Sequence, residues 1–159
     1  MEVEVKIKGL MIDPISNLPI IILKDKKSDS VLPIWVGIFE ANAIALQIEK
    51  IGTPRPMTHD LIKNLLETLS AQVKKIVITE LKESTFFALI YLDVQGTVVE
   101  IDSRPSDAIA IALRAEAPIY VDEEVIAKAK KIDLKDAGES ERLRKWLENL
   151  DPDDLGTTQ

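Results

Sequence analysis

The spacing of apolar residues in this chain switches between a period of two and a helical period, and it does so in blocks rather than in regular alternation. Such an order favours an α+β domain over a doubly wound parallel sheet, in which strands and helices alternate. We therefore expect a single compact domain with a mixed or antiparallel sheet and helices packed on it. The expected strands are residues 2–12, 19–24, 30–36, 73–83, 85–94, 97–102 and 118–121, and the expected helices are residues 38–50, 58–69, 105–113, 123–130 and 140–149.

The domain is expected to span residues 1–150, followed by a flexible acidic tail at residues 151–159. The hydrophobic fraction of 46% is ample for a core. Pro33 cannot donate a backbone hydrogen bond, so its strand should lie at a sheet edge or contain a bulge. We expect Trp35, in the same strand, to belong to the core rather than to a surface that stacks nucleic-acid bases.

Composition excludes several classes of chemistry. The chain contains no Cys, which rules out disulfides, zinc-thiolate sites and cysteine nucleophiles. His59 is the only His, which rules out a multi-histidine metal site within one chain. The first residues do not follow the pattern of a signal peptide, and no apolar run is long enough to span a bilayer. We therefore expect a cytoplasmic protein that does not contact a membrane.

The net charge of −7 argues against tight nucleic-acid binding without a metal, because phosphate contacts need Lys and Arg. The charge is unevenly distributed along the chain. Residues 133–159 hold eight acidic and four basic residues, so −4 of the −7 lies there and −3 in the other 132 residues. A local basic groove in the body of the domain is compatible with these numbers.

The segment at residues 55–60 (RPMTHD) has two interpretations. In the structural one it starts a helix, with Thr58 as the N-cap and Asp60 favourable to the helix dipole. In the functional one His59 carries a proton, Asp60 orients it, and Arg55 contacts a phosphate. Free backbone N–H groups at the helix start would also suit a phosphate.

Carboxylates cluster at residues 100–107 (EIDSRPSD). Glu100 and Asp102 share a face of the expected strand, and Asp107 follows in the first turn of the next helix. Together with Glu40, at the start of an earlier helix, such carboxylates are typical ligands of Mg²⁺ or Mn²⁺. The alternative is that Asp107 and Glu40 are ordinary first-turn acids.

Between these carboxylates lie Arg104 and Ser106, which suit a phosphate group. Here too a structural interpretation stands beside the functional one. Pro105 fits the first position of a helix, and Arg104 fits an ion pair with Asp107 or Asp102.

Three ordered segments resemble the bifunctional nuclease domain family. They are residues 32–37 (LPIWVG) with 40–41 and 43–44, residues 55–61 (RPMTHDL) and residues 101–110 (IDSRPSDAIA), and residues 147–154 are also similar. The resemblance covers about residues 2–155 and implies an α+β domain. It also implies DNase and RNase activity, which gave the family its name. The residue roles proposed above come from the motifs and not from the family.

We therefore expect a metal-assisted nuclease of low sequence specificity that acts on DNA or RNA. The alternative is a non-enzymatic regulatory module that binds a small ligand or a protein. A homodimer is expected, because Pro33 marks an edge strand and residues 143–150 carry an apolar stripe. The expected catalytic residues are His59, Asp60, Asp102 and Asp107, the expected substrate-binding residues are Arg55, Arg104 and Ser106, and the expected metal ligands are Asp102, Asp107 and Glu40.

Overall fold

The computed structural model describes residues 1–135, so the helix expected at 140–149 and the tail expected at 151–159 lie outside the described residues. Strands and helices follow the predicted blocks, and the α+β fold is confirmed. The elements are β1 (Glu2–Ile12), β2 (Pro19–Asp25), β3 (Val31–Trp35), α1 (Ile38–Ile48), α2 (Thr58–Thr68), β4 (Ala71–Lys82), β5 (Thr85–Val94), β6 (Thr97–Ser103), α3 (Pro105–Ala115), β7 (Ile119–Asp122) and α4 (Glu123–Lys135).

All seven strands belong to one sheet, in the order β3-β2-β1-β7-β4-β5-β6. Neighbouring strands are antiparallel except β4 and β7, which are parallel, so the sheet is mixed. The short strand β7 joins the N-terminal hairpins to the β4–β5–β6 meander. Strands β1–β3 and strands β4–β6 are separate blocks in the sequence, and β7 lies between them and joins them into one sheet.

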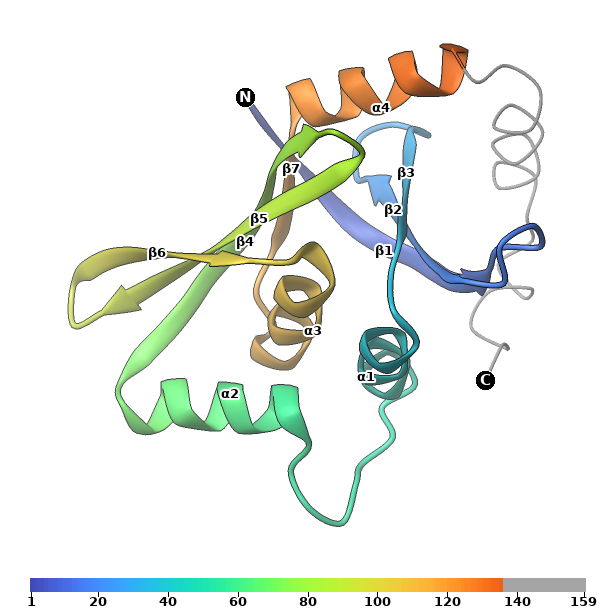
Figure 1. The fold of residues 1–159 in the computed structure, drawn as a ribbon. Helices are drawn as coiled ribbons and strands as arrows, with labels where there is room; N and C mark the ends of the chain where they lie inside the picture. Colours follow the sequence, from blue (N-terminus) through green and yellow to red (C-terminus); the bar gives the residue numbers. More distant parts are fainter. Residues whose placement is uncertain (136–159) are drawn as a thin grey trace.

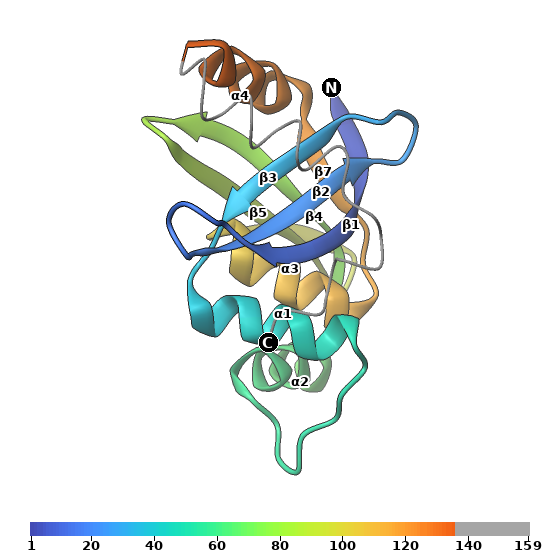
Figure 2. The ribbon, with the colours of Figure 1, turned by 90° about the vertical axis from the view of Figure 1, so that its right-hand side faces the viewer.

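Helices α1, α2 and α3 lie together on one side of the molecule, whereas α4 lies at the opposite end (Figures 1 and 2). Helix α3 is the central one: it packs against both α1 and α2 and against β4 and β5. Its residues Ala108, Ile109, Ala110 and Ala112 are completely buried. Small alanine side chains let neighbouring helices approach closely, which brings the first turns of α1, α2 and α3 within reach of one another. No helix within residues 1–135 is long and apolar enough to cross a membrane.

The two edges of the sheet are β3 and β6. The position of Pro33 in β3 confirms the predicted edge strand. The prediction that Trp35 belongs to the core is wrong, because its side chain is 41% exposed. Its indole Nε1 instead donates a 2.7 Å hydrogen bond to Oδ2 of the buried Asp13. A polar N–H needs such a partner, and Asp13 supplies it at the margin of the sheet.

Candidate functional site

Three helix starts supply the acidic side chains of the site. Glu40, Asp60 and Asp107 lie in the first turns of α1, α2 and α3. Helix α3 begins at Pro105, as predicted, and Arg104 takes the N-cap position. The predicted cap of α2 is wrong by one residue, since Met57 takes the N-cap position and donates its backbone N–H to Asp60 Oδ2 at 3.0 Å. A first-turn carboxylate thus holds the start of α2.

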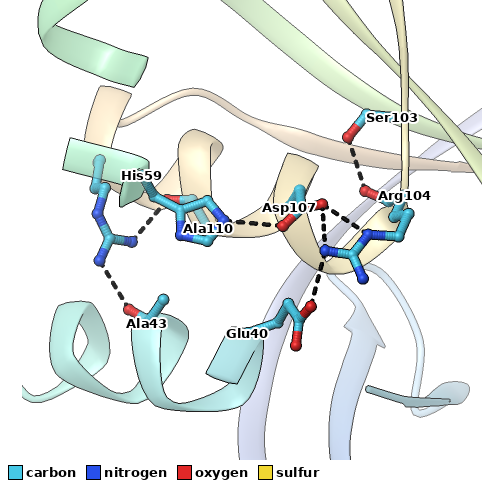
Figure 3. A network of polar contacts seen from close by, with 8 residues as sticks. Glu40, Ala43, His59, Ser103, Arg104, Asp107 and Ala110 are labelled. Atoms are coloured by element: carbon cyan, nitrogen blue, oxygen red, sulfur yellow. Dashed lines mark hydrogen bonds and ion pairs between the residues drawn. The ribbon is translucent and has the colours of Figure 1, made fainter. Parts of the chain in front are cut away.

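His59 and Asp107 are in direct contact, although they lie 48 residues apart in the sequence. His59 Nε2 is 2.9 Å from Asp107 Oδ1, and this contact joins α2 to α3 (Figure 3). The His59 side chain is 11% exposed and that of Asp107 is 28% exposed. Burial opposes ionisation of Asp107, but hydrogen bonds from His59 and Arg104 outweigh it and lower the pKa of this carboxyl. Asp107 is therefore ionised at neutral pH.

The charge of Asp107 determines the tautomer of His59. An ionised carboxylate only accepts hydrogen bonds, so Nε2 of His59 must carry the proton. In the neutral ring the lone pair then resides on Nδ1, which makes no hydrogen bond to the described residues. This arrangement leaves Nδ1 as the nitrogen that can accept a proton from a bound molecule.

Arg104 connects two of the acidic residues through a single guanidinium nitrogen. Its Nη2 is 2.8 Å from Glu40 Oε1 and 2.7 Å from Asp107 Oδ2, and its Nε donates to the same Asp107 oxygen at 2.8 Å (Figure 3). Hydrogen bonds to Asp107 and then to Glu40 raise the pKa of Arg104. An added Cβ at Gly37 would collide with Glu40 Oε2, so glycine leaves room for this side chain in its present position. Glu40, Arg104, Asp107 and His59 thus form one network, which we call the ion-pair network.

Asp60 belongs to a neighbouring set of contacts, centred on Arg114. Arg114 Nε donates to Asp60 Oδ1 at 2.7 Å, Nη1 to the carbonyl of Ala110 and Nη2 to that of Ala43, both at 3.0 Å. The Arg114 side chain is only 4% exposed. The backbone hydrogen bond from Met57, and then the interactions with Arg114, lower the pKa of Asp60. Arg114 therefore ties the start of α2 to both α1 and α3.

One expectation about these residues needs correction, and one residue was missed. Asp60 was expected to orient His59, but the carboxylate that contacts His59 is Asp107. Arg114 was not predicted at all. A basic residue in the last turn of a helix is the usual complement to the helix dipole, so its sequence position carries no signal of burial.

The other predicted site residues do not take part in the ion-pair network. Asp102 is exposed on the edge strand β6, and its register partner is Leu89 of β5. Ser106 is buried, with 6% exposure. Arg55 lines a pocket of about 350 Å³ whose lining includes Asp60 and Arg114. Eight site residues were predicted. The ion-pair network contains four of them, which are Glu40, His59, Arg104 and Asp107.

The three predicted metal ligands are only partly assembled. Glu40 and Asp107 both contact Arg104 Nη2, so their carboxylates converge on one point. Asp102 lies on β6 opposite Leu89, and within the described residues it forms no ion pair with Arg104 and no hydrogen bond with Glu40 or Asp107. Within the part of the chain that the structure describes, no group of three or more His, Asp or Glu side chains is arranged to hold a metal ion.

Comparison with known proteins identifies the family. The model of the bifunctional nuclease domain matches residues 21–133, which include every residue of the ion-pair network. The chain belongs to the bifunctional nuclease domain family. The resemblance inferred from the three sequence segments is thereby confirmed.

Bifunctional nuclease domains occur in relatives of different length. An uncharacterized protein of Mycobacterium tuberculosis is 36% identical over 165 residues, which cover 98% of this chain and 99% of that protein. Bifunctional nuclease 1 of Oryza sativa subsp. japonica is 29% identical over 109 residues, or 67% of this chain and 33% of the rice protein. Bifunctional nuclease 2 of Arabidopsis thaliana is 30% identical over 93 residues, which are 57% of this chain and 28% of that protein. The similarity to the plant proteins is thus limited to about a third of their length.

Proposed function

We propose that this bifunctional nuclease domain hydrolyses phosphodiester bonds in DNA or RNA with low sequence specificity. The names of its plant relatives support a nuclease. The single observation that carries the proposal is the contact between His59 Nε2 and Asp107 Oδ1. A histidine fixed by an ionised carboxylate, with its second nitrogen unpaired, is a common arrangement for a general base.

In the proposed reaction His59 Nδ1 accepts a proton from the attacking water. The water oxygen forms a bond to phosphorus, and the bond from phosphorus to the leaving oxygen breaks. The leaving oxygen takes up a proton from solvent and His59 returns its proton to solvent, so the products are a phosphate monoester and an alcohol. Asp107 keeps His59 in the required tautomer and stabilises the imidazolium that forms. Arg104 is 63% exposed and carries further N–H donors for the phosphate. Phosphate contacts carry no base information, in keeping with low sequence specificity.

A divalent cation, Mg²⁺ or Mn²⁺, is part of this proposal. Glu40 and Asp107 are the residues that would hold it, because their carboxylates both contact Arg104 Nη2, which the cation would displace. Bound there, the cation would polarise the phosphodiester. Asp102 does not fit this position as the chain is arranged, so its proposed role rests on sequence spacing alone. Asp60 acts through Arg114 and positions the start of α2.

A non-enzymatic binding module is the second candidate, and one observation favours it. Glu40 and Asp107 are both paired with Arg104, which is also how a purely structural ion-pair network is built. Exposed apolar side chains, including Ile38 and Phe39 next to Glu40, offer a surface for a partner.

The experiment that separates the two candidates is a nuclease assay on highly purified protein. Single-stranded and double-stranded DNA and RNA are offered with Mg²⁺, with Mn²⁺ and with EDTA. His59→Gln should abolish cleavage without unfolding the protein, whereas Lys26→Gln, which removes an ion pair with Glu4, should cleave like the parent. Cleavage that persists at the same rate in His59→Gln would remove His59 from the mechanism. No cleavage by the parent protein under any condition would favour the binding module.

A further inference from the structure

A polar pocket lies between α1, the loop that follows it, and α2. Its volume is about 350 Å³, and its lining comprises Gln47, Thr53, Pro54, Arg55, Pro56, Asp60, Lys63, Asn64 and Arg114. The loop projects from the molecule at the end away from α4 (Figure 2). The lining includes none of Glu40, His59, Arg104 and Asp107, so the pocket is a separate feature from the ion-pair network.

The floor of this pocket is electrically balanced. Arg114 and Asp60 form an ion pair at 2.7 Å, and the remaining guanidinium contacts of Arg114 go to two backbone carbonyls. Arg114 therefore directs three of its five N–H donors to partners within the protein, and its charge is balanced by Asp60. The charge that a ligand would meet is determined by the other lining residues.

The other charged lining residues are Arg55 and Lys63, and both are cationic. The Arg55 side chain makes no ion pair or hydrogen bond with the described side chains of residues 1–129. Lys63 is 3.3 Å from Glu67, one turn along α2, in a pair that is 34% and 62% exposed and hence weak. The lining thus carries three positive charges and one negative charge. This excess of +2 is notable because the whole chain has a net charge of −7.

The backbone around Arg55 is restricted by its neighbours. Arg55 stands between Pro54 and Pro56, whose rings restrict the backbone, and Thr53 Oγ1 donates a 2.8 Å hydrogen bond to the Arg55 carbonyl. A loop that is already ordered loses little entropy when it binds a ligand. The free cation is therefore presented at the pocket by a preorganised segment.

From these features we infer that the pocket binds a phosphate monoester group, with Arg55 and Lys63 as its cationic ligands. A monoester carries close to two negative charges at neutral pH, which matches the excess charge of the lining. The guanidinium of Arg55 can bind two phosphate oxygens at once. The side chains of Gln47 and Asn64 add amide donors, and the volume exceeds that of a phosphate alone. A nucleoside or a nucleotide chain attached to the phosphate therefore has room.

This inference goes beyond the proposed nuclease activity, because binding here needs no cleavage. A phosphate with nearly two negative charges occurs in inorganic phosphate, and as a monoester in a nucleotide such as AMP and at the phosphorylated end of a nucleic acid. It is also what phosphodiester hydrolysis produces. The three sources are distinguished by the probes used below.

Calorimetric titrations of the full chain test the inference. The probes are inorganic phosphate, AMP, and one dinucleotide with and without a 5′-phosphate. We expect the monoester probes to bind, and more weakly as salt is added. Arg55→Gln should weaken binding about tenfold or more, the usual effect of losing a charge-assisted hydrogen bond. Lys63→Gln should weaken it less, and Lys74→Gln, which alters an ion pair with Asp93 in the sheet, should not change it.

Each outcome of the titrations is informative. Equal affinity for phosphate and AMP assigns the site to phosphate alone, and tighter binding of AMP or of the phosphorylated dinucleotide assigns it to that source. The inference is overturned if no monoester binds, if Arg55→Gln binds as the parent does, or if the dinucleotide binds equally well without its phosphate. Phosphate binding without any nuclease activity would count against the proposed function and leave this inference standing. Cleavage without phosphate binding would support the proposed function and overturn this inference.

Discussion

His59 Nε2 lies 2.9 Å from Asp107 Oδ1, and this contact joins the first turn of α2 to the first turn of α3. A second contact, between Asp60 and Arg114, joins the same turn of α2 to the far end of α3. The two contacts attach the start of α2 to α3 at Asp107 and at Arg114, which lie two helical turns apart. The orientation of His59 therefore depends also on the ion pair between Asp60 and Arg114, in which His59 takes no part.

Asp107→Asn tests the pairing directly. Asparagine keeps the size of the side chain but removes the charge that fixes the tautomer of His59 and attracts Arg104. We expect cleavage to fall by at least about a hundredfold, the lower range for general acid–base catalysis. The unfolding free energy should change by about 1 kcal/mol or less, because Arg104 is largely exposed. Activity assays and urea unfolding measure both effects, and a variant that cleaves normally but is less stable would make Asp107 a helix-start residue only.

Arg114→Met should destabilise the protein although it keeps the apolar part of the side chain. It leaves Asp60 without its cation and removes the guanidinium hydrogen bonds to two backbone carbonyls. The expected loss is about 2–4 kcal/mol in the free energy of unfolding, measured with urea. The matched control is Lys63→Met, which breaks an exposed ion pair in α2 and should cost less than about 0.5 kcal/mol. Equal effects of the two substitutions would contradict the role assigned to Arg114.

Acid should destabilise the protein in part through Asp13. Burial opposes its ionisation, but hydrogen bonds from Trp35, the Ile15 backbone and Ser16 outweigh burial and lower its pKa below the usual 3.8. Because the folded pKa lies below the unfolded one, the stabilisation is present above the unfolded pKa and is lost as pH falls through the folded pKa. The unfolding free energy of Asp13→Asn should therefore fall less steeply below about pH 4 than that of the parent. Identical slopes for the two proteins would refute this.

Millimolar Mg²⁺ or Mn²⁺ should raise the melting temperature, since an ion that binds the native state stabilises it by mass action. Glu40→Gln should reduce the shift, because Glu40 and Asp107 are the converging carboxylates. Asp102→Asn should leave the shift unchanged, since Asp102 lies exposed on β6. If Asp102→Asn removes the shift and Glu40→Gln does not, the cation binds elsewhere than proposed.

Light scattering should show a dimer, as expected from the sequence. The start of α1 is a candidate surface for the dimer interface, because two apolar residues there are exposed: Phe39 is 88% exposed and the adjacent Ile38 is 68% exposed. A charged residue buried in an interface is costly, so Phe39→Glu should shift the mass toward the monomer. A monomer mass for the parent protein across a wide concentration range would exclude the dimer. A dimer unaffected by Phe39→Glu would place the interface on another surface.

Local features of the fold could be predicted because their causes are local. The Gln95-Gly96 turn between β5 and β6 is one example: both residues have positive φ, which Gly96 adopts without strain, and the Asp93 side chain accepts the Gly96 N–H. Pro105 likewise marks the first residue of α3. The candidate residues His59, Arg104 and Asp107 were found for the same reason, since charged groups at helix starts are visible in the sequence.

Which of these residues meet was decided by the packing of the helices. Asp60 and His59 are neighbours in the sequence but point to different partners, Arg114 and Asp107, because successive residues of a helix face about 100° apart. Trp35 lies not in the core but at the edge of the sheet, where its indole N–H donates to Asp13, 22 residues away in the sequence. The sequence by itself determined the order and type of the elements through periodicity, proline and glycine. Only the tertiary structure decided the contacts of His59, Arg104 and Arg114, because a long polar side chain takes its partner from whichever element is packed against it.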